Sequence, residues 1–223
     1  VMDARRMQDE LRTRLRLEDD LGTLHTIAGV DVGYDIKRNL AHASIVTMYM
    51  GELKPLEQVQ VFVPVEFPYI PGLLAFREIP AILAALTELC IMPDLLMVDG
   101  HGIAHPRRMG IAAHLGLLLD LPAIGVAKSR LTGRFEMPGQ YKGDHRLLMA
   151  GTEQIGYVLR SKDHVNPLFL SPGHRVSMAT ALDITLRCLT RYRLPEPTRI
   201  ADKLSKCKTT ELIALPEHAK QIA

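Results

Sequence analysis

The alternation of apolar and polar residues along the chain predicts a mixed α/β architecture. Residues 2–17 place Met7, Leu11 and Leu15 four positions apart among charged residues, which indicates an amphipathic helix. Three strand-like runs follow without a helix-sized segment between them, and this order is typical of an antiparallel meander. These runs are residues 25–34, 41–50 and 58–65.

The second half of the chain alternates helix-like segments with short buried strands. Residues 73–90 and 109–119 are apolar at helical spacing, and Pro80 is expected to kink the first helix or shift its boundary. Residues 95–98 and 123–127 are continuous apolar runs, which is typical of parallel strands. The remaining elements expected are a loop at 136–145, strands at 153–160 and 167–170, a helix at 177–192, and a tail after Ser205 without an interpretable pattern.

These elements predict a single domain over residues 1–223, built on a mixed sheet with helices on its faces. A chain of this length buries about 70% of its unfolded surface, so it needs no metal or disulfide to form a core. The longest apolar stretch, residues 115–127, is broken by Asp120 and Pro122, so we expect no membrane span.

Charge and cysteine content bear on partners and compartment. The net charge is only +2, which permits nucleic-acid binding where positive charge is locally concentrated. The three cysteines form neither a metal-type pair nor a disulfide framework, and the charged start of the chain has no signal-peptide pattern. We therefore expect a reducing, cytoplasmic compartment.

Asp31 is the first candidate for chemistry, because it is a carboxylate in an otherwise apolar strand. Strand alternation places Gly29 and Gly33 on the same face as Asp31. A buried carboxylate is costly unless it is paired or bound to a metal, and flanking glycines would leave room for a ligand beside it. The alternative is an edge strand whose Asp31 faces water, and this segment alone does not decide between the two.

The segment DGHGIAHPRR, residues 99–108, is the second candidate. Asp99 ends a buried strand, and ligands of parallel sheets bind beyond the carboxyl ends of the strands. Gly100 and Gly102 would let the backbone approach a phosphate, and His105 and the two final arginines strengthen the pattern. The alternative is a tight strand-to-helix turn that needs glycine for geometry and Asp99 as a cap.

Positive charge is concentrated in the same region. Residues 101–134 contain five Lys or Arg and one acid, so this stretch carries a net charge of +4. Such a concentration is typical of contact with a phosphate backbone. Lys128 ends the second buried strand, where a snorkelling surface lysine is the alternative to a phosphate contact.

The motif PYIPG, residues 68–72, would hold Tyr69 and Ile70 away from the surface, because proline restricts the backbone. Rigid apolar projections of this kind wedge between stacked bases, and the alternative is a stiff loop that packs Tyr69 on its own core. Glu78 and His174 have weaker local signals. Glu78 is either a solvated helix charge or a third metal carboxylate. His174 is by default a polar residue before a helix, and the alternative is a metal or proton-transfer role.

The chain contains, in this order, GVDVGY, PYIPGLLAFRE, DGHGIAHPRR, GVAKSRL, SPGH and RLPEPTR. Between about residues 27 and 201 it thereby closely resembles endonuclease V, the deoxyinosine 3′ endonuclease family. The resemblance implies a ribonuclease H-like fold, with which the order of elements agrees. It also implies a DNA repair enzyme that recognises deaminated adenine. With Mg²⁺ or Mn²⁺, such an enzyme hydrolyses the second phosphodiester bond on the 3′ side and leaves 3′-hydroxyl and 5′-phosphate ends.

The resemblance also assigns roles to residues of this chain. It implies a catalytic set of Asp31, Glu78, Asp99, Lys128 and His174. Asp31 and Asp99, with Glu78, would form the metal site, and Lys128 would neutralise phosphate charge or position the water. Tyr69 would be the wedge. The other implied substrate contacts are Ile70, Pro71, Gly72, Gly100, Gly102, His105, Arg107, Gly110 and Ile111.

The expected partner is damaged DNA that contains inosine, single- or double-stranded, and we expect a monomer without membrane association. Three alternatives stand: a ribonuclease H-like nuclease of junctions or flaps, an inosine-specific ribonuclease acting on RNA, and a non-catalytic nucleic-acid-binding module. The last is disfavoured, because Asp31, Glu78 and Asp99 would repel nucleic acid if no metal were bound. The sequence does not decide between one and two metal ions.

Overall fold

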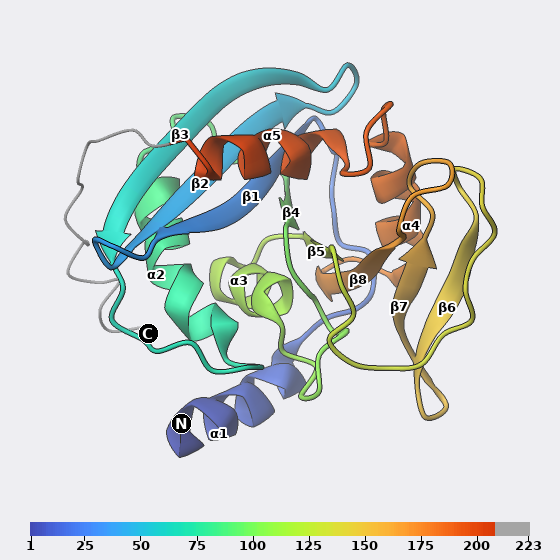
Figure 1. Ribbon diagram of the computed structural model, residues 1–223, viewed down its shortest axis with the longest axis horizontal. Coiled ribbons are helices and arrows are strands. Elements are labelled where there is room, and N and C mark those ends of the chain that lie inside the picture. The colour runs from blue at the N-terminus through green and yellow to red at the C-terminus, as the bar shows by residue number, and fades with distance from the viewer. Residues whose placement is uncertain (208–223) are drawn as a thin grey trace.

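The computed structural model describes residues 1–207 and contains an eight-stranded mixed sheet with helices on both faces (Figure 1). The strands are β1 (Thr26–Asp35), β2 (Leu40–Tyr49), β3 (Lys54–Pro64), β4 (Leu95–Val98), β5 (Ala123–Ala127), β6 (His145–Ala150), β7 (Glu153–Leu159) and β8 (Leu168–His174). The helices are α1 (Met2–Leu11), α2 (Leu74–Thr87), α3 (Ile111–Leu119), α4 (Met178–Arg187) and α5 (Glu196–Ser205), with a 3₁₀ turn η1 (Arg12–Arg14).

The strand order across the sheet is β3-β2-β1-β4-β5-β8-β7-β6. Strands β1, β2 and β3 form an antiparallel meander, while β1, β4 and β5 run parallel to one another. The carboxyl ends of these three parallel strands therefore lie at the same edge of the sheet, where α/β proteins bind ligands. The predicted fold class, a meander followed by parallel βα units, is confirmed.

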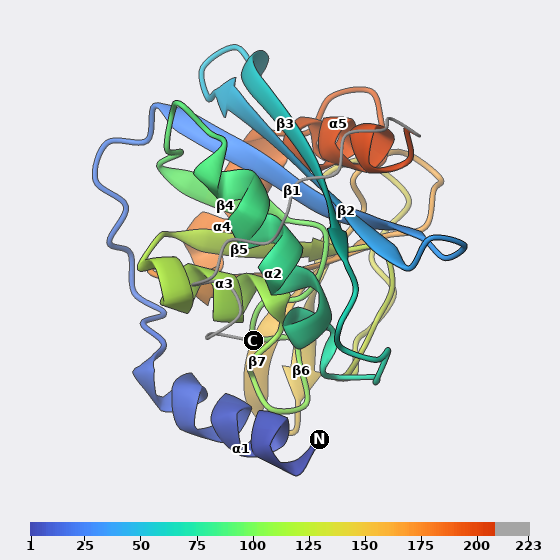
Figure 2. The same ribbon diagram turned by 90° about the vertical axis from the view of Figure 1, so that its left-hand side faces the viewer.

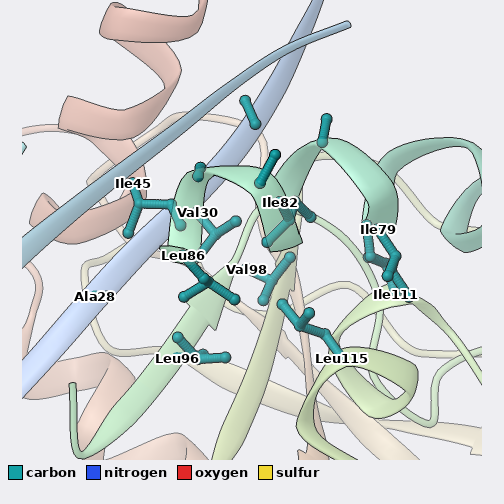
Figure 3. Close-up of a cluster of buried hydrophobic side chains, with 14 of the residues drawn as sticks. Ala28, Val30, Ile45, Ile79, Ile82, Leu86, Leu96, Val98, Ile111 and Leu115 are labelled. Atoms are coloured by element: carbon teal, nitrogen blue, oxygen red, sulfur yellow. The ribbon is translucent and has the colours of Figure 1, made fainter. Parts of the chain in front are cut away.

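Apolar side chains form a core on each face of the sheet. Ala28 and Val30 of β1 face α2 and α3, where Ile82 and Leu115 belong to the same cluster (Figure 3). Ile27, on the opposite face of β1, belongs to the cluster that includes α4 and α5. Figure 2 shows α2 and α3 on one side of β1 and β2, with α5 on the other. The period-2 alternation of β1 thus places Asp31 on the face that α5 covers.

Helix α5 approaches β1 closely because two residues of the strand have no side chain. A Cβ atom on Gly29 would lie 2.0 Å from the carbonyl oxygen of Pro197. A Cβ atom on Gly33 would lie 2.4 Å from the carbonyl oxygen of Ser205. The two glycines accommodate the first and last turns of α5, so the expectation that they leave room for a ligand is corrected.

Several elements differ from the sequence prediction. Helix α1 ends at Leu11 and α4 ends at Arg187, so both helices are shorter than predicted. The predicted N-cap of α4 is confirmed, because the Ser177 hydroxyl accepts the Thr180 N–H at 3.2 Å. Helix α2 runs through Pro80. Strand β6 and helix α5 are not among the predicted elements: β6 begins at His145, the last residue of the expected loop, and α5 is mostly polar. The tail expected to lack a pattern falls mainly on residues 208–223, outside the residues described.

None of the helices within residues 1–207 is both long and apolar enough to cross a membrane.

Replacing Gly29 with alanine is expected to lower the free energy of unfolding by roughly 1–3 kcal/mol, because the α5 backbone must move to admit a methyl group. Urea unfolding followed by circular dichroism measures the change. Gly51→Ala is the matched control, since a Cβ there meets the ring of Tyr49, which is 44% exposed. An unchanged unfolding midpoint for Gly29→Ala would contradict the close approach of α5 to β1.

Candidate active site

Three carboxylates from separate elements meet at the carboxyl edge of the parallel strands. Asp31 lies in β1, Asp99 directly follows β4, and Asp202 lies in α5. The backbone N–H of Asp99 donates to the carbonyl of Val30 at 2.9 Å, which aligns Asp99 with Asp31. One oxygen of each carboxylate lies within 4.8 Å of the others, and all three residues are partly buried. Like charges at this spacing raise the free energy of the cluster unless a cation lies among them.

Lys128 supplies part of the positive charge. It directly follows β5 and forms ion pairs with both Asp99 and Asp202. Burial opposes the charged ammonium, but the carboxylates outweigh it and raise the pKa of Lys128, so the side chain stays protonated. Lys206 approaches Asp202 at 2.6 Å. Burial alone would raise the pKa of Asp202, but hydrogen bonds from the two lysines lower it.

The positive charge of Lys128 does not neutralise the cluster. Burial and then the charge of Asp31 raise the pKa of Asp99 to about 7, against the opposing effect of Lys128. Such a shift means that another negative charge is unfavourable at this point. Carboxylate oxygens are the ligands that Mg²⁺ and Mn²⁺ prefer. The cluster of Asp31, Asp99 and Asp202 therefore fits a divalent cation.

Glu78 lies beside this cluster on α2 and is 7% exposed. Its carboxylate accepts a hydrogen bond from the hydroxyl of Tyr34 at 3.0 Å. Burial raises the pKa of Glu78 to about 8; the Tyr34 hydrogen bond opposes this, and the charges of Asp31 and Asp99 add to it. Glu78 is near enough to interact electrostatically with both aspartates, but it is outside the group whose oxygens lie within 4.8 Å.

The last turn of α5 orients Asp31. The hydroxyl of Ser205 donates to Oδ2 of Asp31. The carbonyl of Ser205 in turn accepts from Nδ1 of His42 at 2.8 Å, and Nε2 of His42 lies 3.2 Å from Oε1 of Gln60. His42 is only 2% exposed, and its hydrogen bond to Ser205 is buried. The same helix therefore supplies one carboxylate and fixes another.

A pocket of about 230 Å³ lies next to the carboxylates. Gly100, which follows Asp99, forms part of its wall, and a Cβ there would lie 2.5 Å from Cγ2 of Ile111. Tyr69 is 68% exposed. Eight predicted substrate residues line the pocket: Tyr69, Ile70, Pro71, Gly72, Gly100, His105, Gly110 and Ile111. The sequence did not single out Gln8, Met109 or Ser129, which also line it.

Two predicted substrate residues make other contacts. Gly102 donates its N–H to the hydroxyl of Ser171 at 2.9 Å, and a Cβ would lie 2.1 Å from the carbonyl oxygen of Pro172. Glycine is therefore needed there for packing against β8, and Gly102 does not line the pocket. Arg107 donates to the carbonyl of Gly72 at 2.7 Å and to Oε1 of Gln8 at 2.6 Å. Its guanidinium holds the pocket wall through these two hydrogen bonds, and a direct contact of Arg107 with substrate stays a prediction.

The structure does not bring His174 to the carboxylates. His174 ends β8, opposite the first residue of β5, whereas Lys128 follows the last. At about 3.3 Å per residue, the length of β5 separates the backbone positions of the two residues by about 16 Å. His174 is 1% exposed, and its Nε2 lies 3.1 Å from Oδ1 of Asp120. We therefore remove His174 from the candidate catalytic set, and Asp202 takes its place.

Asp202 is the functional residue that sequence reasoning missed. Two signals were present: Pro197 in the first turn of α5, and Ile200 and Leu204 at a helical spacing of four. Together they would have predicted the helix. They would not have predicted that it crosses β1 beside Asp31, because that depends on the tertiary contact at the two glycines.

Comparison with known proteins gives a family and a fold. Residues 9–203 match the family model described as endonuclease V. The endonuclease V of Azotobacter vinelandii (strain DJ) is 53% identical over 202 residues, which cover 91% of this chain and 91% of that protein. The endonuclease V of Xylella fastidiosa (strain Temecula1) is 49% identical over 217 residues, which cover 96% and 91%.

Solved structures agree with this match. The crystal structure of endonuclease V from Streptomyces avermitilis has a TM-score of 0.86 at 44% identity, covering 92% of this chain and 91% of that one. Ciona intestinalis endonuclease V, in complex with a 24mer DNA containing an inosine followed by a ribo-adenosine, has a TM-score of 0.79 at 29% identity, covering 92% and 95%.

The substitution Asp202→Asn is expected to weaken binding of Mn²⁺ at least about tenfold, because it removes one negative charge and one strong oxygen ligand from the cluster. Titration calorimetry of the protein with Mn²⁺ measures the dissociation constant. His174→Gln is the matched control and should bind Mn²⁺ like the parent. Weaker Mn²⁺ binding by His174→Gln, with unchanged binding by Asp202→Asn, would restore His174 to the metal site and exclude Asp202.

Proposed function

The chain belongs to the endonuclease V family of inosine-specific DNA repair nucleases, and we propose that it hydrolyses the second phosphodiester bond on the 3′ side of hypoxanthine in DNA. The observation that supports the proposal most is the meeting of Asp31, Asp99 and Asp202 with Lys128 beside a pocket. Carboxylates that hold a divalent cation, together with a protonated lysine, suit a phosphate, and the adjacent pocket suits an extruded base. The products are a 3′-hydroxyl and a 5′-phosphate, with hypoxanthine still attached to its sugar.

We propose Mg²⁺ as the cofactor, with Mn²⁺ as a substitute. Asp31, Asp99 and Asp202 would hold the ion, and Glu78 lies next to it. A divalent ion bound here would neutralise charge on the phosphate and lower the pKa of a bound water. The hard oxygen donors of the cluster match this choice of metal.

The other side chains bind and orient the reacting groups. Lys128 is protonated and lies between Asp99 and Asp202, so it is placed to donate to a phosphate oxygen at the edge of the sheet. Glu78, held by the Tyr34 hydroxyl, is placed to orient the attacking water. Ser205 keeps Asp31 in one orientation.

The pocket accounts for the choice of base. A target base must leave the stack to be read in a pocket, and an aromatic wedge stabilises the gap left behind. Tyr69, exposed at the end of a proline-restricted segment, is placed to act as this wedge. Gly100 and Gly110 bring backbone groups to the pocket. Hypoxanthine offers a protonated N1 and an O6 acceptor, whereas the 6-amino donor of adenine would clash with an amide donor.

The substrate class and setting complete the proposal. DNA containing inosine is the expected partner, and the DNA of the Ciona complex contains an inosine followed by a ribo-adenosine. Because a ribonucleotide follows the inosine in that complex, cleavage of RNA at inosine is the second candidate function. We also propose a single-domain monomer in a reducing, cytoplasmic compartment, which the free thiols of Cys90, Cys188 and Cys207 support.

A labelled duplex with one deoxyinosine tests the proposed reaction. With Mg²⁺ the protein is expected to nick the inosine strand at the second bond on the 3′ side, and Asp99→Asn should lower the rate about a hundredfold or more. Mass analysis identifies the products, and a matched all-RNA duplex tests the second candidate. Free hypoxanthine released before any strand break, or full activity of Asp99→Asn, would contradict the assignment.

Tyr69→Ala is expected to weaken binding to the inosine duplex by roughly 1–3 kcal/mol, because stacking on an aromatic ring is lost. Binding to an undamaged duplex should change less, since the wedge acts where a base is extruded. Tyr69→Phe keeps the ring and serves as the control. Fluorescence anisotropy measures the affinities of the parent protein and the two variants for both duplexes, and equal losses by Tyr69→Ala on the two duplexes would argue against a wedge.

A further inference from the structure

Three hydrogen-bond donors converge on one carbonyl oxygen at the end of the PYIPG motif. The carbonyl of Gly72 accepts from Nε2 of Gln8 at 3.1 Å, from Nε2 of His105 at 3.0 Å and from Nη2 of Arg107 at 2.7 Å. A carbonyl oxygen has two lone pairs, so three donors saturate it and define its position. Gly72 has a φ of +78°, a conformation that suits glycine. The backbone three residues after Tyr69 is therefore fixed from outside the motif.

Gln8 connects this carbonyl to the rest of the pocket wall. Its Nε2 also donates to the carbonyl of Met109 at 3.0 Å, and its Oε1 accepts from Nε of Arg107 at 2.6 Å. Both amide hydrogens and the amide oxygen are thus engaged, and Gln8 is 1% exposed. A buried amide satisfied in this way keeps one geometry, because any displacement leaves a buried polar group unpaired.

The helix that carries Gln8 has few other buried contacts. Helix α1 lies below α3 in both Figure 1 and Figure 2. Of its ten residues, only Ala4 and Gln8 are buried, one turn apart on the same face. Ala4 belongs to a small cluster with Leu73 and Phe76, against which Ile70 of the PYIPG motif packs. The buried face of α1 therefore contacts the motif and the pocket rather than the two main cores.

We propose that Gln8 is a positioning residue for base recognition, and that α1 braces the wedge through it. This inference rests on the proposed function, because it takes Tyr69 to be the wedge. A wedge held in its binding orientation before DNA arrives loses less conformational entropy on binding. Gln8 thereby contributes to selectivity for hypoxanthine sites from outside the matched residues 9–203.

A single fluorescent reporter tests this directly, because the chain contains no tryptophan. The variant Tyr69→Trp places that reporter in the wedge, and time-resolved anisotropy measures its local motion without DNA. Adding Gln8→Ala is expected to increase this motion. In the Tyr69 background, Gln8→Ala should lower the preference for an inosine duplex over an undamaged one about tenfold, the effect of losing one or two hydrogen bonds.

Two further variants separate the hydrogen bonds from helix stability. Gln8→Glu keeps the length and the acceptor for Arg107 but cannot donate to Gly72, so it should behave like Gln8→Ala if the amide acts as proposed. Arg6→Ala, on the exposed side of α1 in contact with Asp3 and Glu10, should change neither reporter motion nor preference.

Thermal unfolding confirms that each variant is folded. Unchanged motion of the indole reporter and unchanged preference in folded Gln8→Glu would overturn the brace, whether or not Gln8→Ala folds. The reporter needs no activity. A parent protein that fails to cut inosine DNA would therefore overturn the proposed function while leaving the brace separately tested.

Discussion

Helix α5 lies against β1 with backbone atoms in direct contact, and the carboxylate cluster depends on that contact. The hypothetical Cβ atoms of Gly29 and Gly33 would overlap the carbonyl oxygens of Pro197 and Ser205. With side chains at the two positions, the helix would sit farther from the strand. Asp202 would then leave the group within 4.8 Å, and Asp31 would lose its hydrogen bond from Ser205. A site for a small ion is thus built by the packing of a helix on a strand.

The electrostatics of the cluster follow from this geometry. Three carboxylates are brought together in a partly buried site, and the lysine among them is too little positive charge to balance them. Burial is the main cause of the raised pKa values of Asp99 and Glu78, and the charges of the neighbouring aspartates add to it. A divalent cation would balance the negative charge of the carboxylates. A phosphate would then be attracted by that cation and by Lys128. The adjoining pocket selects the base, so the sites of chemistry and of base recognition lie next to each other at the same edge of the sheet.

Much of this could be predicted from the sequence, for identifiable reasons. Asp31 and Asp99 stood out because each is a carboxylate in or at the end of an apolar strand, which is a local pattern, and ligands of parallel sheets bind beyond the carboxyl ends of the strands. His174 was misplaced because SPGH lies in β8, which runs antiparallel to β5 and ends at the opposite edge. Asp202 was missed because its role depends on a tertiary contact. The hydrogen bond of Arg107 to the pocket wall was not predicted, since the sequence shows its charge but not the carbonyl that it binds.

Anomalous diffraction from crystals grown with Mn²⁺ is the most direct test of the central claim, that one divalent-metal site is shared by β1, the end of β4 and α5. The account predicts an anomalous peak at coordinating distance from carboxylate oxygens of Asp31, Asp99 and Asp202 together. A fully occupied Mn²⁺ peak elsewhere, with the three carboxylates bound to lysines alone, would contradict it.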